Sequence, residues 1–283
     1  MKTRVAPQVR VALLATFVAA GFAAPVAAAP VNLVDQASTV TLDPATGLVT
    51  DWLVDGQDQL KEMSFWFRTA SSTHEELVAG NTPGLTLNTV TKTGTDELFL
   101  EYIDDDGGFI IELEYILAGF SAASRASDLE VIATVHNSTA SALNFTLFQY
   151  TDLDLRSVAD DETVDFTLPF IPALPSTVVQ QDDTTNATET VPLTSPDYYS
   201  ADVASTLRWV FTDGAVSTLN DANNATTPID AAWAYQWDFV IPAGESSTVT
   251  KDIGLTNVPE PATIALLGLG LGLMAPRLRK RSA

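Results

Sequence analysis

The longest row of chemically capable side chains lies near the middle of the sequence, between residues 143 and 156. If this stretch is one extended strand, Tyr150, Asp152, Asp154 and Arg156 share a face. An aromatic ring followed by two carboxylates and a guanidinium can stack on a sugar and bind its hydroxyls, or hold a cation through the carboxylates. The alternative, which the sequence favours, is a solvated strand face with a weak Asp–Arg surface pair, because antiparallel sheets often have one such face. The row is kept as a candidate ligand face.

A second acidic group, Asp104, Asp105 and Asp106, is followed by two glycines and suggests a calcium loop. An EF-hand loop needs Gly at its sixth position and Glu at its twelfth. Counted from Asp104, these positions hold Phe109 and Tyr115, so the EF-hand match fails. A solvated hairpin turn is therefore favoured over an irregular cation site. Ca²⁺ is the one cofactor that the sequence suggests, and otherwise none is expected.

The sequence does not point to a particular reaction. His74 and His136 have no recognisable Ser or Asp companion, and no Gly-x-Ser-x-Gly motif is present. The chain has no cysteine, which excludes a thiol nucleophile, a Cys-based zinc site and an iron–sulfur cluster. A glycosidase needs only two suitably spaced carboxylates, but 36 acidic residues offer too many pairs to select one. We predict no catalytic residue and lean toward a protein that is not an enzyme.

Short β-strands must position these groups, because period-two alternation recurs along most of the chain. Residues 97–103 and 109–117 flank the glycine-rich turn and form the clearest predicted hairpin. Further strands are expected at 39–42, 48–54, 64–68, 85–91, 129–135, 143–155, 164–168, 207–212, 233–241 and 248–253. About a dozen short strands without a convincing amphipathic helix predict one all-β domain, an antiparallel β-sandwich.

Aromatic residues and polar stretches complete this picture of the domain. Trp233, Tyr235, Trp237 and Phe239 share one strand face, which is either an exposed carbohydrate platform or, as we favour, part of the core. The same interpretation applies to Trp52 and to residues 65–67. Two polar segments, 156–208 and 214–230, are predicted to be long surface loops.

The charge balance restricts the partners of this domain. Residues 31–257 contain seven lysines and arginines against 35 acidic residues, a formal net charge of −28. Such a surface repels nucleic acid, whose binding depends on neutralising phosphates, and anionic lipid headgroups. We expect no nucleic-acid partner.

The N-terminus is typical of a secretory signal peptide. Residues 1–10 carry three basic residues and no acid, residues 11–24 are apolar, and small residues follow up to Ala29. This order predicts processing by signal peptidase, with cleavage after Ala28, because Pro30 would be a poor first residue after a cut at Ala29. The domains are then 1–28, an exported acidic domain at 31–257, and a tail at 258–283.

The tail has three parts: the motif Pro259, Glu260 and Pro261, an uncharged stretch at 262–275, and a basic end containing Arg277, Arg279, Lys280 and Arg281. The uncharged stretch is shorter than the roughly 20 residues that span a membrane, and its glycines weaken it as a helix. We expect a short apolar transmembrane helix that anchors the chain transiently. The basic end stays cytoplasmic under the positive-inside rule.

This three-part order resembles the PEP-CTERM sorting signal of Gram-negative bacteria that produce exopolysaccharide. The resemblance covers about 25 residues and implies recognition by an exosortase, loss of the tail, and residence in the cell envelope or outside the cell. It implies nothing about the fold of the remaining chain.

Three functions fit these observations. The leading hypothesis is a non-catalytic protein of the cell envelope or biofilm matrix that associates with exopolysaccharide. The second is a secreted carbohydrate-binding module or glycan-active enzyme, since a sandwich this large fits the galactose-mutarotase-like type, an analogy at the level of fold alone. The third is an adhesin module stabilised by calcium.

Overall fold

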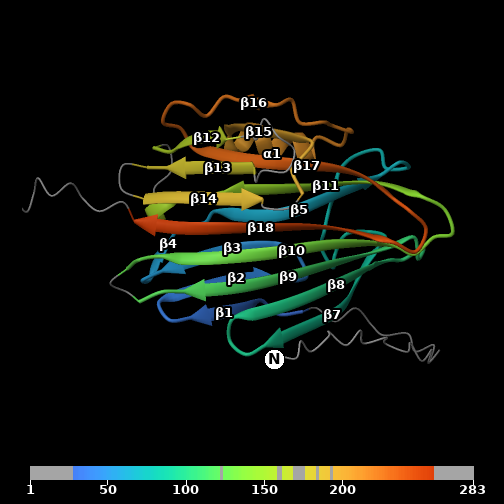
Figure 1. Cartoon of the computed structure of the whole chain (residues 1–283), viewed down its shortest axis with the longest axis horizontal. Helices are drawn as coiled ribbons and strands as arrows, with labels where there is room; N and C mark the ends of the chain where they lie inside the picture. The colour runs from blue at the N-terminus through green and yellow to red at the C-terminus, as the bar shows by residue number, and fades with distance from the viewer. Residues whose placement is uncertain are drawn as a thin grey trace, which may run out of the picture.

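The computed structural model describes residues 28–257, apart from 122–123, 158–160, 168–175, 183–184 and 192–193. Figure 1 shows two layered, predominantly antiparallel sheets, which confirms the predicted all-β sandwich. The sorting motif, the basic end and nearly all of the predicted signal peptide lie outside the described residues. Among the residues that are described, no helix is both long and apolar enough to cross a membrane.

The first sheet has the strand order β1-β2-β3-β5-β11-β17-β15-β16, with β4 paired to β3 and β6 paired to β5. Its strands are β1 (Val31–Asp35), β2 (Ser38–Asp43), β3 (Leu48–Val54), β4 (Gln57–Asp58), β5 (Glu62–Thr69), β6 (Glu76–Leu77), β11 (Leu143–Asp152), β15 (Tyr198–Val203), β16 (Ala222–Asn223) and β17 (Ala231–Ile241).

The second sheet has the strand order β12-β13-β14-β18-β10-β9-β8-β7. Its strands are β7 (Leu85–Thr93), β8 (Glu97–Asp104), β9 (Phe109–Gly119), β10 (Ser127–Asn137), β12 (Thr163–Thr167), β13 (Ser176–Gln181), β14 (Thr185–Val191) and β18 (Ser246–Asn257). The predicted hairpin of β8 and β9 is present, with Leu100 opposite Leu113.

The main core lies between the two sheets and follows the period-two pattern of their strands. In β9 and β10, buried residues alternate with half-buried ones along the whole strand. Trp233, Tyr235 and Trp237 have no exposed surface and belong to this core together with Trp52. The interpretation of these aromatic residues as core is confirmed.

The predicted strand at 207–212 is wrong, because these residues belong to the helix α1 (Ala204–Thr212). The buried residues of α1 are Ala204, Leu207 and Phe211, spaced as one face of a helix. The six residues 207–212 are rich in β-branched and aromatic side chains, which by themselves favour a strand. The helical spacing becomes visible only when the window is extended back to Ala204.

The predicted strand at 164–168 is present as β12, but the prediction of a long loop over the rest of 156–208 is wrong, because this segment also contains β13, β14 and β15. Polar residues face the sandwich interior here: Gln180 of β13 and Glu189 of β14 have no exposed surface. Hydrophobic alternation is therefore weak in these strands, and it is the pattern from which strands are predicted.

Candidate functional site

The helix α1 covers part of the outer face of the first sheet and creates a second apolar cluster there. Its residues Leu207 and Phe211 pack on Trp66 of β5 and on Phe148 and Tyr150 of β11. These sheet residues point away from the main core because they alternate with core residues along β5 and β11. Figure 1 shows α1 beside β15 and β17 on the outer side of the sandwich.

Phe211 is at the centre of this cluster. Its ring stacks on that of Trp66 with centroids 5.6 Å apart, and it meets the ring of Phe148 edge-on at 5.5 Å. The guanidinium of Arg208 lies 5.1 Å from the Trp66 centroid and also forms an ion pair with Glu62. Trp66 is consequently only 6% exposed. It can offer an edge to a ligand, but not a free face.

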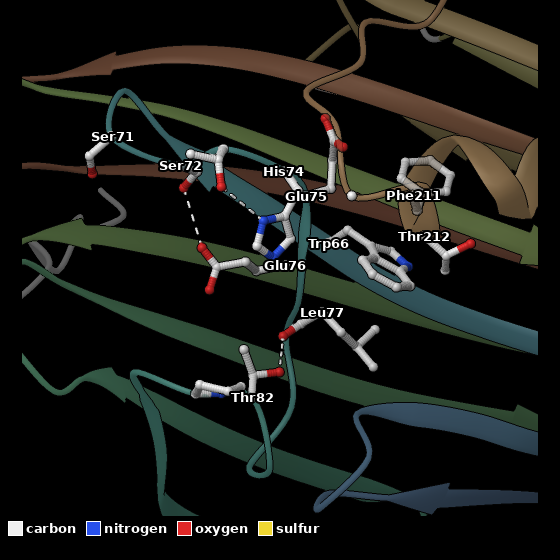
Figure 2. Close-up of a pocket in the computed structure, with 13 residues that line it drawn as sticks. Trp66, Ser71, Ser72, His74, Glu75, Glu76, Leu77, Thr82, Phe211 and Thr212 are labelled. Carbon is white, nitrogen blue, oxygen red and sulfur yellow. Dashed lines mark hydrogen bonds between the residues drawn. The ribbon is translucent and has the colours of Figure 1, made fainter.

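A pocket of about 530 Å³ opens between the end of α1 and the chain that follows β5. Its apolar side comes from Trp66 and Phe211, and its polar wall comes from residues 71–76. Figure 2 shows side chains of this wall at the left and centre of the view, and Trp66 and Phe211 at its right. The pocket therefore combines an aromatic floor with a rim of hydroxyl, imidazole and carboxylate groups, which suits a polar organic ligand.

The polar wall is held in place by a buried carboxylate. Glu75 forms an ion pair with Arg68 at 2.9 Å and accepts a hydrogen bond of 2.7 Å from the backbone N–H of Ser217. Arg68 also donates to the carbonyl of Ser217 and lies over the ring of Phe148, 5.1 Å from its centroid. The wall is thus attached both to the sheet below and to the segment after α1.

Within the pocket, the side chains of His74 and Glu76 carry the ionisable groups. His74 is exposed, and its Nδ1 lies 3.2 Å from the hydroxyl oxygen of Thr73. Glu76 accepts a hydrogen bond of 3.3 Å from Ser72, which itself accepts one from the backbone N–H of Thr69. An imidazole and a carboxylate in one opening can bind the hydroxyls of a sugar or take part in proton transfer.

The candidate ligand face from the sequence is divided by the structure. Because β11 ends at Asp152, Asp154 and Arg156 do not continue the strand. Tyr150 and Asp152 lie under α1, 1% and 6% exposed, and the hydroxyl of Tyr150 donates to Asp152 Oδ2 at 3.1 Å. Arg156 lies in the short helix η1 (Leu155–Ser157) with φ of +61°. A sugar cannot stack on this tyrosine as it stands.

The other acidic candidates form the turn between β8 and β9. Asp104 Oδ2 accepts a hydrogen bond of 2.7 Å from the backbone N–H of Gly108, and Asp105 accepts one of 2.6 Å from Thr86. Asp106 is exposed. In the described part of the chain, the acids whose oxygens converge as metal ligands would are instead Asp152, Asp154 and Asp230.

This pocket was not predicted from the sequence. Trp66 was predicted to be core and His74 to have no catalytic companion, and the fold brings the two together with Phe211 from a segment predicted as strand. The polar run at 71–76 directly after an aromatic strand was the one local signal available.

Comparison with known proteins supports the sorting tail and the fold of the described domain separately. The family model described as the PEP-CTERM protein-sorting motif matches residues 257–282. It confirms the resemblance of the tail, which implies export and sorting by an exosortase to the cell envelope or beyond. No curated protein matches the sequence.

Solved structures share the fold of the described domain at low sequence identity. A bacterial glucoamylase complexed with acarbose matches with a TM-score of 0.53 and 12% identity, over 83% of this chain and 32% of that one. A putative aldose 1-epimerase from Escherichia coli K12 matches with a TM-score of 0.50 and 10% identity, over 81% and 99%.

A galactose mutarotase-like protein from Lactobacillus casei ATCC 334 matches with a TM-score of 0.51 and 7% identity, over 80% of this chain and all of that one. The chain spans about a third of the glucoamylase but nearly the full length of the other two proteins. The protein therefore carries a C-terminal PEP-CTERM protein-sorting motif, which implies export and sorting by an exosortase, and its described domain has a galactose-mutarotase-like β-sandwich fold.

Proposed function

We propose that the exported domain is a non-catalytic envelope or matrix protein that binds exopolysaccharide in the pocket beside α1. The observation that carries the proposal is the pocket itself, in which Trp66 and Phe211 form an apolar floor and residues 71–76 supply a polar rim. Sugars present both apolar C–H faces and hydroxyl groups, so a site of this mixed character suits them.

The sorting motif supports a polysaccharide as the partner. A protein that an exosortase delivers to the envelope meets the cell's own glycans there. The domain carries an acidic surface, which repels acidic polymers. The expected ligand is therefore a neutral glycan or one that contains amino sugars.

The solved structures support the same ligand class through what they are named. One is an aldose 1-epimerase, one is a galactose mutarotase-like protein and one is a glucoamylase solved with acarbose. Since all three are below 25% identity to this chain, they support a sugar ligand only as an analogy of fold.

Glycan binding tests the proposal directly. We expect the full-length protein to bind neutral glycans, on an array or by calorimetry with the producing cell's own exopolysaccharide. We expect His74→Ala combined with Glu76→Gln to weaken binding by about thirtyfold, since two lost hydrogen bonds of about 1 kcal/mol each amount to about 2 kcal/mol. Their side chains are not in the core, so the melting temperature should change little.

The matched control is the other histidine–carboxylate pair of the domain. His136 and Glu112 lie on the second sheet, 2.9 Å apart and about one-third exposed. His136→Ala combined with Glu112→Gln should leave glycan binding unchanged. Equal loss in both double variants, or binding that survives the pocket variant, would show that the pocket is not the site.

Turnover of a bound sugar is the second candidate function, favoured by the presence of both His74 and Glu76 in the pocket. Interconversion of sugar anomers needs one group to donate a proton and another to accept it. Polarimetry on freshly dissolved aldoses would detect such activity. A rate above the buffer rate that His74→Ala abolishes would replace the binding proposal with an enzymatic one.

The route of the protein is also proposed in detail. We infer that signal peptidase removes residues 1–28 and that the tail at 258–283 anchors the chain transiently in the cytoplasmic membrane of a Gram-negative cell. Exosortase then removes the tail. Mass spectrometry of the mature protein should find an N-terminus at Ala29 and no Arg-Ser-Ala end. An intact C-terminus in cells that express an exosortase would contradict this route.

A further inference from the structure

Three acidic residues meet where β11 ends and β17 begins. Asp152 is the last residue of β11 and is paired with Ala232 of β17 in the antiparallel register. Asp154 lies two residues beyond the end of β11, and Asp230 is the residue before β17. One carboxylate oxygen from each of the three residues lies within 4.8 Å of the others. The adjoining ends of two paired strands therefore bring the three carboxylates together.

One oxygen in this group is buried without a partner. Asp152 is 94% buried, and its Oδ2 accepts a hydrogen bond from the Tyr150 hydroxyl. Its Oδ1 is enclosed and has no hydrogen-bond partner among the described residues. A buried carboxylate oxygen is normally satisfied by a donor or a cation, because leaving it bare costs the full desolvation of that oxygen.

A neighbouring carboxylate, that of Glu162, also has one oxygen without a hydrogen-bond partner among the described residues. Glu162 has no exposed surface, its Oε1 accepts a hydrogen bond of 3.2 Å from the backbone of Leu155, and its Oε2 has no partner among the residues described. Its backbone forms a two-way bridge with Ile229, the neighbour of Asp230. The acidic group thus has a second, buried carboxylate behind it.

The electrostatic surroundings of Asp152 are acidic. The pKa of its carboxyl group is raised to about 7, first by burial and then by nearby Asp230, Asp154 and Glu62, against the hydrogen bond from Tyr150. The pKa of Glu162 is raised to about 8 by burial and then by Asp161 and Asp154. A cation bound among these carboxylates would offset their mutual repulsion.

We propose that Asp152, Asp154 and Asp230 bind a calcium ion between the end of β11 and the start of β17. Ca²⁺ binds oxygen ligands at about 2.4 Å, so two of its ligands can be at most about 4.8 Å apart. One oxygen from each of the three residues lies within this limit of the other two, so the group meets the first geometric requirement of a calcium site. The smaller shell of Mg²⁺, with ligands at about 2.1 Å, limits the separation to about 4.2 Å.

The site is separate from the proposed sugar pocket and has a structural role. The first residue of α1, Ala204, donates its N–H to the carbonyl of Asp230 at 2.8 Å and accepts from the Tyr150 hydroxyl at 3.3 Å. A bound ion therefore fixes two strands and the start of α1. The pocket lies at the opposite end of this nine-residue helix, about 13 Å away along its axis.

Thermal unfolding of the full-length protein tests the site, with CaCl₂, MgCl₂ or NaCl compared at equal ionic strength after treatment with EDTA. We expect CaCl₂ at about ten times its dissociation constant to raise Tm by about 3–6 °C. MgCl₂ should have a smaller effect, and NaCl almost none. Calorimetry with CaCl₂ should give one site.

Substitution of the ligands gives the sharper result. Asp154→Asn and Asp230→Asn each keep the size of the side chain and remove one charge, so we expect at least a tenfold loss of calcium affinity. In EDTA, both variants should melt at or above the Tm of the parent because repulsion among the acids falls. Each variant should therefore lose calcium affinity without losing thermal stability in EDTA. A residue that only supports the fold would lower the Tm in EDTA as well.

The control substitutions are Asp105→Asn and Asp106→Asn in the exposed turn between β8 and β9. They should leave the calcium response intact, whereas loss of the response there would move the site to that turn. The proposal is overturned if CaCl₂ and NaCl shift Tm equally, or if the response to CaCl₂ survives in Asp154→Asn combined with Asp230→Asn.

Discussion

Lys251 Nζ lies 3.7 Å from Glu189 Oε2 in the interior of the sandwich, and both side chains are essentially without exposed surface. Glu189 Oε2 also accepts hydrogen bonds from Gln149 at 3.0 Å and from the indole of Trp233 at 3.3 Å. The ammonium lies 5.3 Å from the ring centroid of Phe65. The core of this domain therefore contains an ionisable pair, from β14 and β18, that faces residues of the other sheet.

Removal of the lysine should destabilise the domain because it leaves a buried carboxylate without its cation. We expect Lys251→Met to lower the free energy of unfolding by about 3 kcal/mol at pH 8. Burial raises the pKa of Glu189, so at pH 5 this carboxyl group is more readily protonated in the variant and the loss should be smaller. Urea unfolding at the two pH values measures both effects.

The double variant Lys251→Met with Glu189→Gln is the matched control. The amide keeps an acceptor for Gln149 and Trp233 but carries no charge, so most of the lost stability should return. A double variant that is no more stable than Lys251→Met would show that the two groups are not energetically paired.

Asp128 on β10 should make stability depend on pH in the acid-to-neutral range. The pKa of its carboxyl group is raised to about 7, first by burial and then by Asp252 on β18 and by Glu130. The folded protein then holds a proton there between about pH 4 and pH 7 that the unfolded chain releases. Because the folded state binds more protons in this window, stability should fall as the pH rises through it.

The substitution Asp128→Asn should remove this contribution. Relative to the parent, we expect the variant to gain about 1 kcal/mol at pH 8, a value reduced for solvent screening, and nothing at pH 4. Asp106→Asn, in the exposed turn, should show no such difference between the two pH values. A parent and variant with parallel stability curves would contradict the raised pKa.

The sandwich itself was predictable because most of its strands carry the alternation that burial on one side imposes. Residues 48–54 form a strand with the predicted bounds, and Trp233 and Tyr235 lie in the predicted core. Prediction failed where polar residues fill the interior. Glu189 and Gln180 give β13 and β14 the pattern of solvated chain, and their hydrogen-bond partners Gln149 and Leu153 are distant in the sequence.

The candidate sites were less predictable, because each depends on segments that are distant in sequence. The acidic group needs Asp230, which is 76 residues from Asp154 and comes close to it because β11 and β17 are paired. The pocket needs Phe211 on a helix that a six-residue pattern represents as a strand. Local spacing contains no information about either pairing.

The helix α1 allows a prediction about its two large aromatic residues. Phe211 is 2% exposed and packs on Trp66, Phe148 and Tyr150, whereas Trp209 is 64% exposed. We expect Phe211→Ala to destabilise the domain by about 3–4 kcal/mol through lost burial and a cavity. Trp209→Ala should change stability by less than about 0.5 kcal/mol. Chemical unfolding of both variants decides, and similar losses would contradict the placement of α1.

Gly119 at the end of β9 gives the last prediction, which tests how the sheets meet. A Cβ at this position would lie 1.9 Å from the carbonyl oxygen of Asp35, at the end of β1 in the other sheet. This contact is with backbone, so Gly119→Ala must push β1 and β9 apart, and the hydrogen bond of 2.8 Å from the Gly119 N–H to Asp35 Oδ2 would be strained as well. We expect a loss of about 2–3 kcal/mol, within the range for overpacked positions.

Gly254 of β18 is the control, since a Cβ there meets its nearest atom, Asp128 Oδ1, at 3.4 Å. Gly254→Ala should cost less than about 1 kcal/mol, and if both alanine variants unfold at the same urea concentration, the close approach of β1 to β9 is wrong.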